Sequence, residues 1–429
     1  MEKQQISQYL SILKSEISPA LGCTEPAAVA LAVAYAAHEL SSEPISIEVN
    51  VSRYIFKNGM NVGIPGTGMI GLDIAVALGA LSAAPEKQLL VLNGLSDEQK
   101  KRAVELVGEK KIHIGLADNE EKVWIQAKLT DGVDEAEAVI AGTHTGLALL
   151  RRNGELLFEK KPENAPSAQE TKEEAYTITL DSIVDFVNSV EGSELTFLRE
   201  VIRLNRTISE EGLSHDYGLK VGRSILAGDK TGLLTNDIAT FAVACTAAAA
   251  DARMAGCDKP VMSAAGSGNQ GLTASLPVAS IGWKLNLPEE KVLRALALSI
   301  LVTIHTKHYI GRLSVLCGCS IAASIGSCCG IVYLFDGSVV QMKYGINSMV
   351  ADISGVVCDG AKPGCALKIA TAVNSAIRAA TMALNNIGAD AHDGIVTFDV
   401  EKTLENLGTL GNEGMAEANS AILDMMLHK

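Results

Sequence analysis

The spacing of apolar positions changes along the chain. Between about residues 43 and 160, apolar and polar residues alternate in short runs, a pattern typical of half-buried strands. These runs are "ISIEVNVSRYIF", "LLVLNG", "KIHIGLA", "KVWIQAKLT" and "AEAVIAGTH", with an exposed helix predicted over "LSDEQKKRAVELVGEK". We therefore predict a small α+β domain over residues 43–160.

Helical periods dominate the rest of the chain. Long Ala-rich segments with few charges recur from residue 175 to residue 429, and such helices are buried on most sides. A similar helix follows Thr24, the expected N-cap, with Pro26 in its first turn. We expect residues 1–42 to pack with 175–429 as a mostly α-helical domain with buried central helices. The fold class is then α+β, and the charged, Pro-containing stretch 161–174 is a predicted linker.

One segment permits two interpretations. Leu313–Phe335 carries no charge and has the length of a membrane span. It is also crowded with Gly, Ser and Cys, which favours tight packing inside the protein. We expect a buried core segment here and no membrane contact.

Composition then restricts the function classes. The formal net charge is −14 and no long basic run occurs, whereas nucleic-acid binding needs a positive face. No nucleic-acid partner is expected. The first residues lack the apolar region of a signal peptide, and the nine cysteines are expected to be reduced thiols of a cytoplasmic protein.

Two glycine-rich loops are candidate binding sites. "GTGMIG", with Gly66, Thr67 and Gly68, fits a dinucleotide fingerprint, but it also fits a turn whose amides approach a small anion or a plain structural turn. The second loop, "SAAGSGNQG", carries Ser267, Asn269 and Gln270, which could bind a carboxylate or an amino group. The alternative is a loop that satisfies its own backbone.

Histidines and thiols supply the remaining candidates. His305 and His308 form an HxxH pair that could hold zinc with Cys317 and Cys319, line an active site, or simply pack.

Cys358 and Cys365 flank "DGAKPG", and Cys365 begins a predicted helix. Together with Cys317 they are one thiolate short of an electron-transfer iron–sulfur site. Three thiolates would leave one iron of a 4Fe–4S cluster open as a Lewis acid. Burial in a tightly packed core is the alternative.

Taken together, "PALGCTEP", "GSGNQG", "KHYIGRLSVLCGC" and "CDGAKPGC" resemble the L-cysteine desulfidases, relatives of the iron–sulfur L-serine dehydratase alpha subunit. The resemblance covers nearly the whole chain. It implies a 4Fe–4S lyase that converts L-cysteine to pyruvate, ammonia and hydrogen sulfide. It also implies cluster ligation by Cys317, Cys358 and Cys365, and proton abstraction by Cys23.

The sequence leaves several points open. Cys319, Cys328 and Cys329 crowd the first ligand, and Cys319 could replace Cys317. The alternatives are an L-serine dehydratase or, outside the enzymes, a zinc-stabilised or membrane-associated binding protein. The expected partner is a small amino-acid substrate, and a homo-oligomer would suit the buried helices. The candidate substrate-binding residues are Gly66, Thr67, Gly68, Ser267, Asn269, Gln270, His305, Lys307, His308 and Arg312.

Overall fold

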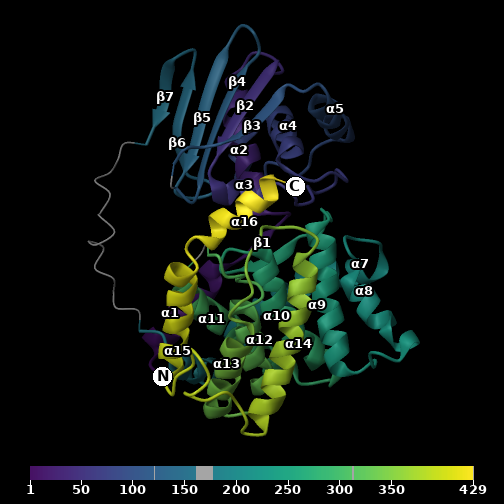
Figure 1. Cartoon of the computed structure of the whole chain (residues 1–429), viewed down its shortest axis with the longest axis vertical. Helices are drawn as coiled ribbons and strands as arrows, with labels where there is room; N and C mark the ends of the chain where they lie inside the picture. The colour runs from purple at the N-terminus through teal and green to yellow at the C-terminus, as the bar shows by residue number, and fades with distance from the viewer. Residues whose placement is uncertain (120, 161–176, 312–313, 429) are drawn as a thin grey trace.

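The computed structural model describes the chain except for residues 120, 161–176, 312–313 and 429. The predicted linker and Arg312 lie outside the described residues. A sheet with its covering helices forms one part of the molecule, and a bundle of long helices forms the other (Figure 1). The predicted α+β class is confirmed.

A six-stranded mixed sheet organises the smaller part, with strand order β3-β2-β4-β5-β6-β7. β2 pairs with β3 in parallel, and the other neighbours are antiparallel. The strands are β2 (Ser46–Val51), β3 (Ile112–Leu116), β4 (Trp124–Thr130), β5 (Glu135–Ala141), β6 (Leu147–Arg152) and β7 (Glu155–Glu159).

Three details of this part differ from the predicted elements. The run "LLVLNG" is not a strand, because its first residues end the 3-10 helix η1 (Pro85–Leu90) and a turn follows. The strand predicted through Phe56 stops at β2, and α3 (Arg53–Gly59) begins after it. The hairpin of β6 and β7 was not predicted. Its turn is Asn153-Gly154, with φ of 51° and 80°, the left-handed conformation that two-residue hairpins require.

The N-terminal segment is divided between the two parts. α1 (Lys3–Glu16) packs against the bundle, and β1 (Ile17–Ala20) pairs with β8 (Val261–Ala264). α2 (Thr24–His38) instead packs on the sheet. The grouping of all residues up to 42 with the bundle therefore does not describe the packing of α2, whose Ala-rich surface is buried by sheet residues. Cys23, not Thr24, is the N-cap of α2.

Two further helices belong to this part, with α4 (Leu72–Ser82) packed on α2 and α5 (Asp97–Gly108) packed on α4. Both follow the glycine-rich loop. At Gly79 an added Cβ would lie 2.4 Å from the Ala30 carbonyl oxygen. Small residues thus set the distance between the two helices.

The helical part has α9, α10, α11, α12 and α14 at its centre. α10 is buried through most of its length. The long helices are α6 (Leu180–Ser189), α7 (Leu198–Ser214), α9 (Ile238–Met254), α10 (Gly268–Lys284), α11 (Glu289–Ile310), α12 (Ala322–Leu334), α13 (Val339–Ile353), α14 (Cys365–Leu384), α15 (Val400–Thr409) and α16 (Ala418–Leu427). Shorter ones are η2 (Gly192–Leu195), α8 (Val221–Leu226), η3 (Ala227–Thr231) and η4 (Leu410–Gly414).

The uncharged segment ends in α12, a helix of 13 residues in the core. Its Cys328 and Cys329 are both 0% exposed. Among the helices of the described residues, none combines the length and hydropathy needed to cross a bilayer.

The chain ends between the two parts. α16, drawn in yellow in Figure 1, lies near α3 of the sheet-containing part. The buried Lys57 side chain of α3 donates hydrogen bonds to Asn419 Oδ1 at 2.5 Å and to the carbonyl of Cys358 at 3.1 Å. Lys57 therefore connects α3, α16 and the loop that carries Cys358.

Candidate active site

Two loops bring the predicted ligand cysteines together. The loop before α12 and the loop before α14 run antiparallel, with a bridge between Leu316 and Val357. Cys317 N donates to Val356 O at 2.9 Å, and Cys358 N donates to Val315 O at 2.6 Å. Backbone pairing thus fixes two of the cysteines beside each other.

The third cysteine comes from a helix start. Cys365 is the first residue of α14 and is buried. Cys317, Cys358 and Cys365 line one cavity of about 650 Å³. Cys319 lines it too, with its Sγ 3.4 Å from Cys317 Sγ, so the choice between Cys317 and Cys319 as a ligand stays open.

These thiols are protonated in the ordinary pH range. Burial and neighbouring thiols raise the pKa of Cys365 to about 12. The hydrogen bond with Cys319, together with burial, raises the pKa of Cys317 to about 12. The hydrogen bond with Cys317, and then burial, raises the pKa of Cys358 well above its ordinary value. A thiophilic metal would displace these protons.

The donor chemistry fits an iron–sulfur cluster, although the side chains are not gathered around a centre. Within the described part of the chain, no three His, Cys, Asp or Glu side chains form a ready group of metal ligands. Yet three soft thiols face one buried cavity, and thiolates are the ligands that iron–sulfur clusters use. Lys57 and Lys368 line the same cavity, and their positive charge favours an anionic cluster with its thiolates.

Cys23 lies on the same cavity. It is the N-cap of α2, and its thiol donates to Glu25 Oε2 at 2.9 Å. Glu25 also accepts from Thr24 Oγ1 at 3.1 Å and from Asn58 Nδ2 at 3.1 Å. Burial and then the charge of Glu25 raise the pKa of Cys23 well above its ordinary value. The Cys23 thiol is therefore protonated in the ordinary pH range, although it lies at a helix start, where a thiolate is favoured.

The second glycine-rich loop also reaches the cavity. Ser267 is the N-cap of α10, and Asn269 and Gln270 lie in its first turn. Asn269 Oδ1 accepts from Arg253 Nη1 at 3.0 Å. Gln270 Nε2 donates to the Ala265 carbonyl at 3.3 Å, while its buried Oε1 has no partner among the described residues.

The first glycine-rich loop does not line this cavity. Thr67 Oγ1 donates to Ile64 O at 2.8 Å and accepts from Met69 N at 3.0 Å. Gly66 N donates to Gly256 O. The residues Gly66, Thr67 and Gly68 thus form a connecting turn that satisfies its own backbone, and the role predicted for them in binding substrate has no support in the geometry.

The residues of the histidine motif lie on different faces of α11. Lys307 lines the cavity, whereas His305 and His308 do not. His305 is 1% exposed and its Nε2 lies 2.6 Å from Glu401 Oε2, so it joins α11 to α15. A zinc site formed by both histidines with Cys317 and Cys319 is not assembled.

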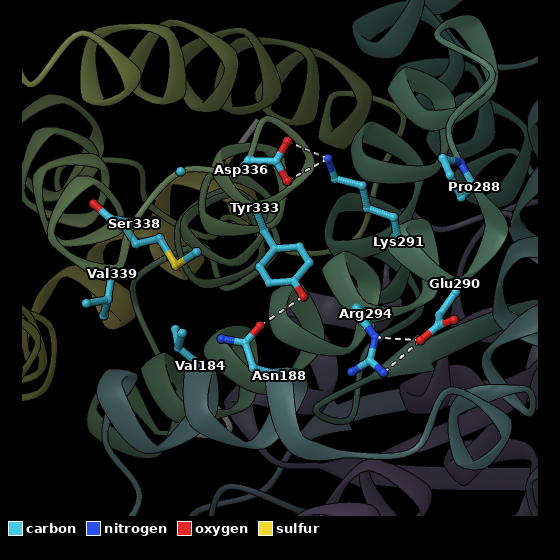
Figure 2. A pocket seen from close by; sticks show the side chains of 12 residues that line it. Val184, Asn188, Pro288, Glu290, Lys291, Arg294, Tyr333, Asp336, Ser338 and Val339 are labelled. Atoms are coloured by element: carbon cyan, nitrogen blue, oxygen red, sulfur yellow. Dashed lines mark hydrogen bonds and ion pairs between the residues drawn. The ribbon is translucent and has the colours of Figure 1, made fainter.

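A second cavity lies on the surface of the helical part, among α6, α11, α12 and α13 (Figure 2). Its charged groups are paired with each other: Arg294 with Glu290 at 2.7 Å and Lys291 with Asp336 at 2.8 Å. None of the candidate residues that the structure describes lines this second cavity. The thiol-lined cavity is therefore the candidate active site.

Several residues of this cavity were not singled out in the sequence. Glu25, Lys57, His144 and Arg253 all line it. "GCTEP" placed Glu25 two residues after Cys23, which was the available signal. Lys57 and His144 come from the sheet-containing part, so both parts of the molecule build the site.

The fold and cavity define an α+β protein with a thiol-lined cavity. A family model described as the serine dehydratase alpha chain matches residues 86–424. A UPF0597 protein of Oleidesulfovibrio alaskensis is 43% identical over 429 residues, 100% of both chains. UPF0597 proteins of Clostridium perfringens and Bacteroides fragilis are each 41% identical, over 98% and 100% of both chains.

The chain belongs to the serine dehydratase alpha chain family. Membership assigns it to the lyase-type enzymes. The predicted relationship to the L-serine dehydratase alpha subunit is confirmed, while cysteine as the substrate and the cluster remain proposals.

Proposed function

We propose that the chain is an iron–sulfur-dependent lyase that eliminates L-cysteine to pyruvate, ammonia and hydrogen sulfide. The observation that carries the proposal is the cavity itself, which Cys317, Cys358, Cys365 and Cys23 all line. A buried site that combines three soft ligands with a separate thiol suits an elimination, which needs both a Lewis acid and a base.

Cys317, Cys358 and Cys365 would hold a 4Fe–4S cluster. When bound through three cysteines, such a cluster supplies an open iron that acts as a Lewis acid on a leaving group. The chain itself would fix the two loops that carry Cys317 and Cys358, and would offset the negative charge of the cluster and its thiolates. Lys57 donates to the Cys358 carbonyl, and Lys368 Nζ donates to the Val357 carbonyl at 2.9 Å.

Cys23 would take the Cα proton of the substrate. It lies at the start of α2, where the unpaired amides of the helix favour a thiolate. Glu25 accepts the hydrogen bond of its thiol and so orients the sulfur. In the state described here the thiol keeps its proton, so Cys23 must be deprotonated before it acts as a base.

L-Serine dehydration is the second candidate, favoured by the family description. The two substrates differ in one atom of the leaving group. Sulfur is the softer donor and matches iron held by thiolates, which favours L-cysteine.

The test is an assay of the anaerobically purified protein with each amino acid. We expect pyruvate and sulfide from L-cysteine, with kcat/KM at least about tenfold above that for L-serine, a plausible gap for one changed group. Pyruvate from L-serine alone would establish the dehydratase, and no pyruvate from either substrate would refute the lyase. We further propose that the enzyme acts in the cytoplasm, where thiols stay reduced.

A further inference from the structure

Two buried charged groups in the cavity form no salt bridge within the described residues, although, against the effect of burial, the nearby imidazole of His144 lowers the pKa of one of them, the Glu25 carboxyl. Glu25 is 8% exposed and accepts hydrogen bonds only from neutral groups, namely Cys23, Thr24 and Asn58. Buried carboxylates are normally paired with a cation, because an unpaired buried charge is costly. An ammonium group entering the cavity would supply the missing charge.

Arg253 is the opposite case. It is 5% exposed, and its guanidinium donates to two neutral acceptors, Gly22 O at 2.7 Å and Asn269 Oδ1 at 3.0 Å. Its buried Nε has no hydrogen-bond partner among the described residues. A guanidinium presents its donors in a fixed fork that matches a carboxylate, so a carboxylate is the expected ligand.

The start of α10 adds donors at the same place. Ser267 gives no side-chain cap to this 17-residue helix, and the first amides of a helix lack intrahelical partners. Gly268 faces Arg253, since a Cβ there would lie 2.4 Å from Arg253 Nε. Arg253 and the helix start therefore form one anion-binding corner.

Both charged groups lie next to Cys23. Arg253 binds the carbonyl of Gly22, the residue before Cys23, and Glu25 binds the Cys23 thiol. Neighbouring hydrogen bonds hold both charged groups, and no ion pair joins them within the described part of the chain. A molecule that carries both charges on one carbon would span them with that carbon next to the sulfur.

We propose that Arg253 and Glu25 form a recognition pair for the α-carboxylate and α-ammonium groups of a free amino acid. The proposal rests on the proposed function for the identity of the substrate class and adds the residues that select it. It explains why Cys23 would meet the α-carbon, because both groups that bind the charges of that carbon lie next to Cys23. Peptides, whose amino or carboxyl group is blocked, would be excluded.

The test uses two thiols that each lack one of the charges. 3-Mercaptopropionate has the carboxylate but no ammonium, and cysteamine has the ammonium but no carboxylate. Contacts made by the thiol are common to both ligands. Anaerobic titration calorimetry of the holoprotein measures their dissociation constants without turnover to pyruvate.

In Glu25→Gln, cysteamine binding should weaken about 10- to 100-fold, the range expected for a lost charge-assisted hydrogen bond. 3-Mercaptopropionate should bind as in the unmodified protein, within about twofold. Arg253→Gln should show the opposite pattern, and Arg253→Lys should keep part of the affinity for 3-mercaptopropionate. Glu290→Gln, in the surface cavity of Figure 2, is the matched control and should change neither constant.

Equal losses for both ligands in a folded Glu25→Gln protein, or no loss for cysteamine, would overturn the proposal. If Arg253→Gln does not fold, the two titrations of Glu25→Gln decide. The proposed reaction fails separately: selective binding without pyruvate formation would refute the lyase but keep the recognition pair. Turnover of L-cysteine with unchanged binding constants in both variants would keep the lyase but refute the recognition pair.

Discussion

Hydrogen bonds to Cys23 and to the preceding residue fix the position of Cys23 in the cavity. Its thiol donates to Glu25, and the carbonyl of the preceding Gly22 accepts from Arg253. Burial and the charge of Glu25 keep the thiol protonated by raising its pKa. Cys23 can therefore act as a base only if substrate binding changes its surroundings and lowers the pKa of its thiol.

The role of Cys23 can be tested separately from the cluster. In Cys23→Ala, the visible iron–sulfur absorbance should persist, because Cys23 is outside the proposed ligand set. Exchange of the substrate Cα hydrogen with deuterated solvent, followed by NMR, should slow by about 10²- to 10⁴-fold. Exchange at the unmodified rate would rule out Cys23 as the base. Cys257→Ala, a buried thiol that does not line the cavity, serves as the control.

At this scale, short motifs predicted the cysteines but not their charged neighbours. Cys23, Cys317, Cys358 and Cys365 stand in compact patterns, and all four line the cavity. Arg253 meets Gly22 across 231 residues of sequence. No local pattern encodes such a contact, because it arises from the packing of β1 and α10 beside α9.

Among the elements, the contact between α2 and α4 depends on a missing side chain. Gly79→Ala would place a Cβ 2.4 Å from the Ala30 carbonyl oxygen, so the helices must separate. We expect a loss of about 1–3 kcal/mol of unfolding free energy, typical of overpacking, measured by urea denaturation. Gly108→Ala, where a Cβ meets nothing within 4 Å, should be neutral or stabilising. Equal stability of the two variants would contradict this account of the packing.

A second prediction concerns the junction of α15 with α6 and α11. Glu401 accepts from Leu180 N at 2.8 Å and lies 2.6 Å from His305 Nε2. Burial raises the pKa of Glu401, but the hydrogen bond and charge of His305 outweigh it and hold the pKa below the ordinary 4.5. A carboxylate with a depressed folded-state pKa stabilises the fold above its unfolded pKa, and that stability is lost as the pH falls through the folded value.

Glu401→Gln should therefore melt at a lower temperature than the unmodified protein at pH 7. The difference should shrink as the pH falls below about 4. Glu405→Gln, on the same helix and paired with exposed Lys402, should show little change at either pH. A gap between Glu401→Gln and the unmodified protein that stays constant down to pH 3 would contradict the assigned role of the Glu401 carboxylate.

Element types were predictable where a period was long and clear. The long helices α9, α11 and α14 and the strands β3, β4 and β5 match the predicted segments. The strand predicted for "LLVLNG" was wrong because an apolar run has no period of its own, and Gln88, just before the run, has a φ of 53° that turns the chain. The packing partner of α2 could not be predicted either, since a helix that is apolar on all sides does not indicate which surface covers it.

For the whole molecule, the main feature is that both parts contribute to one site. Lys57, Asn58 and His144 line the cavity from the sheet-containing part, while the proposed ligand cysteines line it from the helical part. This convergence could not be predicted from residue spacing, because it depends on how the two parts dock. The four predicted cysteines nevertheless line this one cavity, because each short motif keeps its own local geometry.

The central claim is that Cys317, Cys358 and Cys365 hold a catalytic iron–sulfur cluster, and metal analysis tests it most directly. Iron, acid-labile sulfide and visible absorbance should be measured on anaerobically purified protein, on Cys358→Ala, and on Cys328→Ala as the buried-thiol control. We predict about four irons and four sulfides per chain in the unmodified protein and in Cys328→Ala, and loss of both in Cys358→Ala. Turnover of L-cysteine by protein without iron, or a full cluster in Cys358→Ala, would contradict the account.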